Sequence, residues 1–427
     1  MENKKNLRNI VLNMLIKTLE NGEFSHLVLN QVFAEEAFSA QEKAFVNRLY
    51  AGTLEKIFYL DALLDCFSNV KVKKMKPVIR NILRLSVYQL IFMNSVPQHA
   101  CIDEAVKLTR KRGFSNLTGF VNGVLRKIQR EYGNAKVPEY LKKGAPKWFY
   151  ELLCRQYGSE AADQFLENFQ KEDHETTVRF HLSQATEEQI RHSLEEEGCL
   201  VHPIEGVSSG YRISGFESLT DLKAFKDGQI IMQDQSSMLA VEIAASGLKK
   251  PEIILDVCAA PGGKSLFMAD KFPKAKIIAR DLTLYKVNLI KENTKRLNIM
   301  NVEAQLQDAL ILDSTMIQTA DIVIADLPCS GLGVIKKKPD ILYRLKESDL
   351  DQLALLQRNI LAVVYQYVKP GGILLYSTCT VNKQENTENT NWFLENYDFQ
   401  LLEEKQILPG IMQEQDGFYI AKLKRYE

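Results

Sequence analysis

The chain has 427 residues, of which 45% are hydrophobic and 25% charged, and its formal net charge is zero. This length and ordinary composition predict two or three globular domains. No apolar run reaches the ~18 residues of a membrane-spanning helix, and the charged start "MENKKNLRNI" is unlike a secretory signal. Seven scattered cysteines argue against a disulfide framework and a structural zinc site, so we predict a cytoplasmic protein.

Residues 1–130 have apolar residues at helical spacing, which predicts an all-α bundle of five or six helices. Ser39 precedes Glu42 by three residues, the pattern of a capping box at a helix start. Pro77 opens another helical segment, as proline does in a first turn. The helical segments are "LRNIVLNMLIKTLENG", "SAQEKAFVNRLYAGTLEKIFYLDALLDCF", "KPVIRNILRLSVYQLIFM", "CIDEAVKLTRKRG" and "LTGFVNGVLRKIQREYG".

The same 130 residues carry 20 Lys and Arg but 11 Asp and Glu, a net charge of +9, so the rest of the chain carries −9. This asymmetry favours a surface that faces nucleic acid, with "KVKKMK" (71–76) and "RKR" (110–112) as phosphate partners. A solvated helical surface, or a dimerisation module, explains the same charge.

Residues 131–146 lack periodicity and contain Gly, Pro and Lys, which indicates a linker. Residues 147–228 predict a small α/β domain, and residues 229–427 alternate strands with helices, which predicts a parallel sheet covered on both faces. Ligands of such sheets bind outside the carboxyl ends of the strands. The expected strands of the large sheet are "EIILDV", "KIIAR", "VEAQLQ", "DIVIADL" and "GILLYST".

The segment "ILDVCAAPGGKS" (254–265) reads as a strand, a glycine-containing turn and a helix start. A phosphate-binding P-loop needs glycine where Cys258 stands, and the dinucleotide fingerprint Gly-x-Gly-x-x-Gly is absent. The small residues of the turn still let a ligand approach the backbone closely. These residues are Ala259, Ala260, Gly262 and Gly263.

Four aspartates, Asp256, Asp281, Asp308 and Asp326, stand at the ends of four expected strands. Asp281 follows Gly263 by 18 residues, where a carboxylate can accept the hydrogen bonds of a ribose diol. Asp308 is placed to meet an adenine amino group. A single aspartate at a strand end is often a turn residue, but four at one edge favour an adenosine-type cofactor.

Two cysteines also follow strands: Cys329 in "DLPCSGLG" and Cys379 in "LLYSTCTV". A thiolate that adds to carbon 6 of a pyrimidine turns carbon 5 into a nucleophile able to accept a methyl group. Asp326, three residues before Cys329, is placed to stabilise the ring as charge develops. The local sequence leaves open which thiol attacks. For Cys66, Cys101, Cys154 and Cys199 we expect packing roles.

Several segments resemble one enzyme family. "LDVCAAPGGKS", "DLPCSGLGVIKKKPDI" and "YSTCTVNKQEN" resemble motifs I, IV and VI of the RNA 5-methylcytosine methyltransferases, and "QDQSSMLA" (233–240) resembles the segment before motif I. This likeness covers residues 228–427, with "ARDLTLYKV" after the second strand less typical. The helical region with "FVNGVLRKI" resembles the NusB-like RNA-binding domain. The combination is similar to the RsmB (Sun/Fmu) family of small-subunit ribosomal RNA cytosine methyltransferases.

The resemblance implies a multidomain chain with a NusB-like all-α bundle, a small RRM-like α/β domain and a Rossmann-like class I methyltransferase domain. It implies that Cys379 is the nucleophile, that Cys329 assists product release and that Asp326 acts as base or stabilises the ring. It implies S-adenosyl-L-methionine as cofactor and no metal. The implied cofactor residues are Cys258, Ala259, Ala260, Pro261, Gly262, Gly263, Lys264, Asp281, Asp308 and Asp326.

The implied partner is 16S ribosomal RNA, free or in early assembly, and we expect a monomer that contacts no membrane. Other readings stay open at this point. One is a methyltransferase for another RNA, a protein or a small molecule, with structural cysteines. Another is a NusB-like RNA-binding regulator with a decayed catalytic domain, against which the intact Cys379, Cys329 and Asp326 speak.

Overall fold

The computed structural model describes residues 5–169, 171, 175–410 and 416–427, so the first four residues of the charged amino-terminal stretch lie outside it. Packing divides the chain into two compact units. One comprises Met1–Gln170 with Ile335–Glu347, and the other comprises Lys171–Val334 with Ser348–Glu427.

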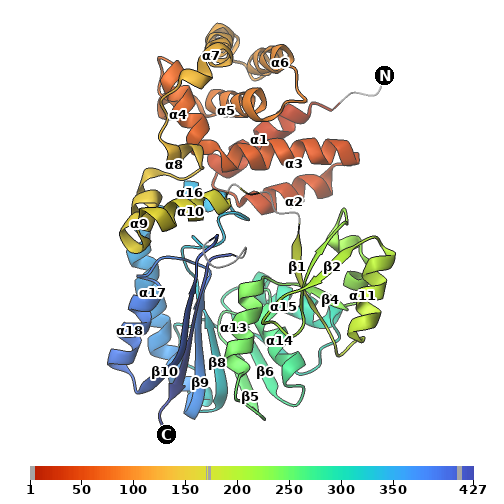
Figure 1. The fold of residues 1–427 in the computed structure, drawn as a ribbon, viewed down its shortest axis with the longest axis vertical. Coiled ribbons are helices and arrows are strands. Elements are labelled where there is room, and N and C mark those ends of the chain that lie inside the picture. The colour runs from red at the N-terminus through yellow and green to blue at the C-terminus, as the bar shows by residue number, and fades with distance from the viewer. Residues whose placement is uncertain (1–4, 170, 172–174, 411–415) are drawn as a thin grey trace. The chain divides into compact units, whose positions relative to one another are not determined.

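The first unit is a helical bundle, as the apolar periodicity predicts (Figure 1). Helix α5 (Pro77–Phe92) begins at the expected proline and packs against α1, α3, α4, α6 and α7, so it forms the centre of the bundle. The predicted capping box is confirmed, because Ser39 and Glu42 each bond the other's backbone N–H. The helices around α5 are α1 (Leu7–Leu19), α2 (Ser25–Glu35), α3 (Ala40–Glu55), α4 (Ile57–Phe67), α6 (Gln98–Lys111) and α7 (Thr118–Glu131).

Three further helices pack in this unit, although the sequence assigned them to a linker and to the small α/β domain. They are α8 (Glu139–Lys142), α9 (Lys147–Tyr157) and α10 (Ser159–Phe169). The rings of Phe149 and Phe165 lie 5.8 Å apart, and Lys143 pairs with Asp163 at 3.3 Å. The packing boundary near residue 170 therefore differs from the predicted boundary at 146.

The segment Ile335–Glu347, from the second half of the chain, also belongs to the helical unit and contains α16 (Asp340–Arg344). Ser25 donates its hydroxyl to Asp340 at 2.5 Å, and the Arg344 guanidinium stacks 4.0 Å over the ring of Phe24. These contacts join residues more than 300 positions apart, which no local sequence pattern reveals.

The second unit contains two sheets. The smaller has the chain order β-α-β-β-α-β and the strand order β2-β3-β1-β4, with antiparallel pairs throughout. This is the RRM-like arrangement that the family resemblance implies. Its members are β1 (Thr176–Phe180), α11 (Glu187–Glu196), β2 (Leu200–Pro203), β3 (Gly210–Ser214), α12 (Lys223–Lys226) and β4 (Ile230–Met232). Strand β4 extends this domain past its predicted end at residue 228.

The larger sheet has the strand order β10-β11-β9-β8-β5-β6-β7. Strands β5 to β9 run parallel, as predicted, whereas β10 and β11 add an antiparallel edge that the sequence reading did not include. The strands are β5 (Ile253–Asp256), β6 (Lys276–Asp281), β7 (Val302–Leu306), β8 (Ala320–Asp326), β9 (Val368–Thr378), β10 (Phe399–Ile407) and β11 (Phe418–Arg425).

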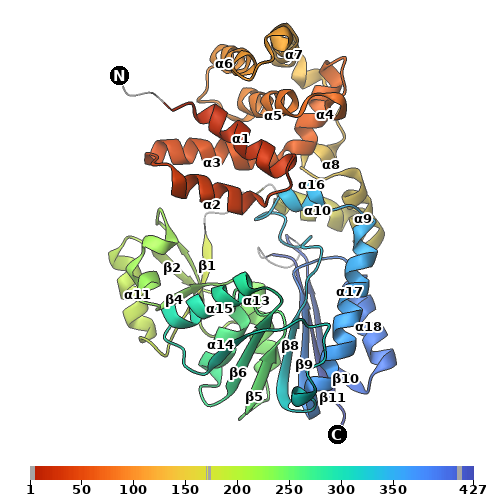
Figure 2. The same cartoon turned by 180° about the vertical axis from the view of Figure 1, so that it is seen from behind.

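Helices cover both faces of this sheet (Figures 1 and 2). Along β8, Ile322 and Ile324 pack in one apolar core, while Val323 and Ala325 pack in the core of the opposite face. This alternation explains why the strand reads as a continuous apolar run. Helices α13 (Gln235–Ala245), α14 (Gly263–Lys271) and α15 (Leu284–Arg296) lie on one face, and α17 (Asp349–Val364) and α18 (Thr387–Asn396) lie on the other.

A buried ion pair ties the two sheets together. Arg179 of β1 is fully buried and pairs with Asp270 of α14, whose other oxygen lies 2.8 Å from the ring of His181.

The strand order of the large sheet reverses between β5 and β8, the place where open α/β sheets bind their ligands. In the part of the chain that is described, no helix is both long and apolar enough to span a bilayer.

We expect Gly228→Ala to destabilise the second unit. Gly228 has φ +70°, and a Cβ there would lie 2.4 Å from the backbone oxygen of Arg296. Strain of this kind costs about 1–3 kcal/mol. The matched control is Gly123→Ala in the interior of α7, where a Cβ meets no atom within 4 Å. That change should stabilise its helix by about 0.5–1 kcal/mol. Thermal unfolding of the two variants measures both effects, and a parent-like melting curve for Gly228→Ala would contradict the first.

Candidate active site

The glycine loop lies at the carboxyl end of β5 and leads into α14. Gly262 has φ +106°, a conformation that side chains rarely adopt, and it caps the helix. The loop is held from outside, because Ala259 N–H donates to the Arg280 carbonyl at 2.8 Å and Asn293 donates to the Pro261 carbonyl at 3.0 Å. The structure thus gathers the expected cofactor residues Cys258, Ala259, Ala260, Pro261, Gly262 and Gly263 in one supported turn.

Asp281 ends the neighbouring strand β6 and is almost completely buried. One oxygen accepts the Ala260 N–H at 3.0 Å, and the other accepts the Leu282 N–H at 2.8 Å and pairs with Lys286 at 3.0 Å. The carboxylate therefore holds the glycine loop against β6. A carboxylate oxygen has two lone pairs, so the oxygen bonded to Ala260 keeps acceptor capacity for a ligand.

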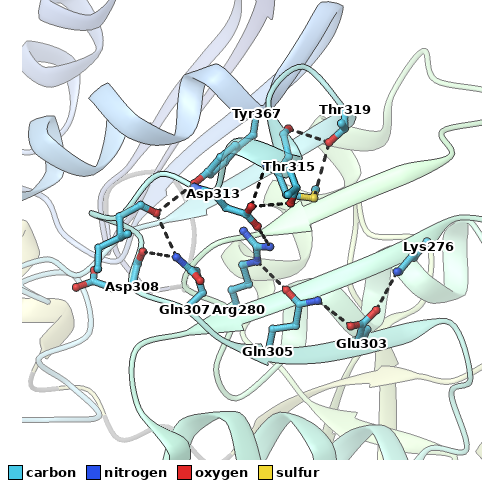
Figure 3. A network of polar contacts seen from close by, with 12 residues as sticks. Lys276, Arg280, Glu303, Gln305, Gln307, Asp308, Asp313, Thr315, Thr319 and Tyr367 are labelled. Carbon is cyan, nitrogen blue, oxygen red and sulfur yellow. Dashed lines mark hydrogen bonds and ion pairs between the residues drawn. The ribbon is translucent and has the colours of Figure 1, made fainter.

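Asp308 follows β7 in a turn, where its carboxylate accepts the Leu310 N–H at 2.9 Å. Figure 3 shows the polar network that holds this turn. Arg280 donates to Asp313 at 2.6 Å and to Gln305 at 2.9 Å. The hydroxyl of Tyr367 accepts the Asp313 N–H at 2.9 Å. Hydrogen bonds from Thr315 and the Arg280 guanidinium lower the pKa of Asp313, so it stays an anion.

Asp256, at the end of β5, differs in position from the other three strand-end aspartates. It is buried beneath α14 and accepts the Ser265 hydroxyl at 2.6 Å. Burial raises its pKa to about 7. Asp256 thus faces the start of α14 behind the glycine loop, whereas Asp281 and Asp326 end β6 and β8 and Asp308 follows β7.

Asp326 ends β8 with both oxygens engaged. Lys264 pairs with one oxygen at 2.6 Å, and Ser377 donates to the other at 2.7 Å. The Lys264 side chain is nearly buried, with its ammonium also 5.2 Å from the ring centre of Phe418. Lys264, which was expected among the cofactor residues, is thus ion-paired with Asp326. Together Lys264 and Ser377 fix the orientation of the Asp326 carboxylate.

The thiols of Cys329 and Cys379 lie 3.3 Å apart, and each is partly exposed. The hydrogen bond to Cys379, burial and the nearby Glu385 raise the pKa of Cys329 well above its ordinary value. Cys329 therefore keeps its proton at neutral pH, and its sulfur lies within hydrogen-bond reach of the Cys379 sulfur. In contrast, burial and the nearby Asp256 and Asp281 raise the pKa of Cys258, which makes that thiol unreactive.

Three residues of this region were not singled out from the sequence. Ser377 and Glu385 lie inside "YSTCTVNKQEN", but nothing in the sequence distinguishes them from their neighbours, and Gln357 of α17 is far from any motif.

One expectation about the other cysteines is wrong: Cys66 is exposed at the end of α4, not packed in a core, whereas Cys101 and Cys199 are buried as expected. Among the residues that the structure describes, no group of three or more His, Cys, Asp or Glu side chains is arranged to hold a metal ion.

Comparison with known proteins agrees with this arrangement. Residues 244–424 match the family model described as 16S rRNA methyltransferase RsmB/F, and residues 5–130 match the NusB family. A relative from Bacillus subtilis (strain 168), named "Probable ribosomal RNA small subunit methyltransferase B", is 33% identical, with 99% of each chain covered. One from Serratia proteamaculans (strain 568), named "Ribosomal RNA small subunit methyltransferase B", is 29% identical at the same coverage.

Solved structures share the fold. The crystal structure of PH0851 has a TM-score of 0.84 and 26% identity, and the match covers 98% of both chains. A methyltransferase homologue from Pyrococcus horikoshii matches 67% of this chain and 97% of its own, with a TM-score of 0.60 and 25% identity. The two family matches cover the helical region and most of the sheet domain, and the full-length relatives cover both. The chain belongs to the ribosomal RNA small subunit methyltransferase B (RsmB) family.

Proposed function

We propose that this protein transfers a methyl group from S-adenosyl-L-methionine to carbon 5 of a cytosine in 16S ribosomal RNA, through a covalent bond between Cys379 and the base. The observation that carries the proposal is the pair of thiols 3.3 Å apart beyond the ends of β8 and β9, together with Asp326 at the end of β8, whose two oxygens are held in place. The family match and the names of the relatives support ribosomal RNA as the substrate.

The residues at the sheet edge fit the cofactor. The backbone of the glycine loop, with Gly262 at φ +106°, offers close approach, and Asp281 and Asp308 offer acceptors at the ends of β6 and β7. Acceptors at these places suit the ribose hydroxyls and the amino group of an adenosine. S-adenosylmethionine, when bound, supplies an electrophilic methyl group on its sulfonium.

The side chains at the thiol pair suit the two halves of the reaction. The Cys379 sulfur adds to carbon 6 of the base, and Asp326, oriented by Lys264 and Ser377, stabilises the charge that develops on the ring. After carbon 5 is methylated and loses its proton to a base, the bond between sulfur and carbon 6 breaks. Cys329, which keeps its proton and lies 3.3 Å away, then protonates the departing sulfur and so assists release.

The helical unit is the proposed RNA-binding part. Lys71, Lys73, Lys74 and Lys76 are exposed, whereas Val72 and Met75 between them are buried, so the lysines of this segment face water. Exposed lysines contact phosphates without reading sequence. The target base must leave its stack to reach the thiols, which costs least in a loop or in partly folded RNA. We propose a monomer that acts in the cytoplasm on free or early-assembling RNA.

Exchange of the two cysteines should separate attack from release. Cys379→Ser should abolish methyl transfer and form no adduct, because the hydroxyl is a poor nucleophile at neutral pH. Cys329→Ala should accumulate a protein–RNA adduct that survives denaturation, because the departing sulfur loses its proton donor. Denaturing gels with labelled RNA measure the adduct. Persistent methyl transfer by Cys379→Ser would remove Cys379 from the mechanism.

The pairing of Lys264 with Asp326 predicts a catalytic defect without a binding defect. Lys264→Met should lower the rate of methyl transfer by about 100-fold, because Asp326 loses the partner that orients it. The dissociation constant of S-adenosylmethionine, measured by calorimetry, should change by less than about threefold. A tenfold change would correspond to about 1.4 kcal/mol of binding free energy. A large loss of cofactor affinity would instead indicate that Lys264 contributes to cofactor binding.

The identity of the target base can be read in cells. Bisulfite sequencing of 16S ribosomal RNA should show one cytosine that is protected when the gene is present and converted when it is deleted. A plasmid carrying the intact gene should restore protection, and one carrying Cys379→Ser should not. An identical conversion pattern with and without the gene would show that the substrate is another RNA or another molecule.

A further inference from the structure

A fully buried carboxylate, Glu385, lies between the two cysteine loops, in the segment that connects β9 to α18. A buried carboxylate is tolerated only when its oxygens are hydrogen-bonded. One oxygen of Glu385 accepts the Ser330 N–H at 2.8 Å and the Gln357 amide at 3.0 Å. The other accepts the Asn382 amide at 3.1 Å. Three neutral donors from three segments therefore converge on one charge.

Two of these donors bracket Cys329. The Ser330 N–H belongs to the peptide that follows Cys329, and it points at Glu385. The Gln357 amide, besides bonding Glu385, donates to the carbonyl of Pro328, on the other side of Cys329, at 3.0 Å. The oxygen of Gln357 accepts from Asn389 at 2.8 Å, which fixes the orientation of the amide. The backbone on both sides of the Cys329 sulfur is thus held by a buried pair of side chains.

The third donor connects Glu385 to the loop of Cys379. Asn382 donates its own N–H to the Thr380 hydroxyl at 3.2 Å, and Thr380 directly follows Cys379. The same hydroxyl lies 2.6 Å from that of Ser330, so a further hydrogen bond joins the two loops. Gly333 N–H completes the connection by donating to the carbonyl of Cys379 at 3.0 Å.

We propose that Glu385 is a positioning residue for product release: it holds the thiol of Cys329 in reach of the sulfur of Cys379. The inference rests on the proposed roles of the two cysteines and goes beyond them, because Glu385 touches neither sulfur and acts through Ser330, Gln357 and Asn382.

The test is Glu385→Gln in the full-length protein, with 16S ribosomal RNA and S-adenosylmethionine. A glutamine of the same size has one acceptor oxygen, so it cannot serve both the Ser330–Gln357 side and the Asn382 side. Misplacement of a reacting group by about 1 Å can cost ~100-fold in rate. We expect multiple turnover to fall by about 10- to 100-fold while the first methyl transfer stays within about threefold of the parent, with a denaturation-resistant adduct.

The matched control is Glu388→Gln, an exposed glutamate three residues further along the chain, which should behave like the parent protein. Parent-like turnover of Glu385→Gln would overturn the inference. An equal loss of both rates without an adduct would do the same, because it would indicate a general structural defect. If Glu385→Gln does not fold, Thr380→Val replaces it, since this change removes the hydroxyl bond between the loops at nearly constant volume; it too must accumulate the adduct.

Cys329→Ala in the same assay separates the two levels of the argument. An adduct with Cys329→Ala but none with Glu385→Gln would refute the positioning role and leave the proposed function standing. The absence of an adduct with Cys329→Ala would refute the release role of that thiol, and the inference about Glu385 with it.

Discussion

Two parallel strands, β8 and β9, pair in a register that places Asp326 opposite Ser377. Most of the geometry around the two thiols depends on this pairing. Because both strands end at the same edge, the thiol three residues beyond Asp326 and the thiol two residues beyond Ser377 come within 3.3 Å of each other. The hydroxyl of Ser377 reaches across the pair to the Asp326 carboxylate. A shift of one residue would turn the side chains of one strand to the opposite face and separate all of these groups.

Three carboxylates at this edge have both oxygens hydrogen-bonded or ion-paired. Asp326 has Lys264 and Ser377, Asp281 has two backbone N–H groups and Lys286, and Glu385 has three neutral donors. Such full satisfaction is what makes buried polar groups tolerable, and it holds them in one arrangement. In the proposed mechanism the consequence is preorganisation: the groups assigned to the ring and to the departing sulfur do not have to be assembled during the reaction.

The helical unit contributes a second kind of constraint. The segment Ile335–Glu347 begins directly after the loop that carries Cys329, yet it packs inside the helical unit through Asp340 and Arg344. The peptide chain thus runs from the thiol loop into the unit that carries the exposed lysines. The segment "DLPCSGLGVIKKKPDI", which resembles motif IV, is therefore not one structural piece: the chain passes from the sheet unit to the helical unit between Val334 and Ile335.

The sequence by itself determined what local patterns encode. Apolar periodicity predicted the helical bundle and the five parallel strands, the capping box at Ser39 and Glu42 was readable in four letters, and motif spacing singled out Cys329, Cys379 and Asp326. These features depend on residues close together in the chain. Only the tertiary structure decided which partners the residues at the strand ends have. Asp256 lies behind the glycine loop, Lys264 pairs with Asp326, and Glu385 connects the two thiol loops. The contacts of Lys264 and Glu385 depend on strand register and on the packing of helices such as α17 against distant loops. Lys264 and Asp326 are 62 positions apart in the chain, and Gln357 and Glu385 are 28 apart. A pattern of neighbouring residues does not reveal contacts over such distances.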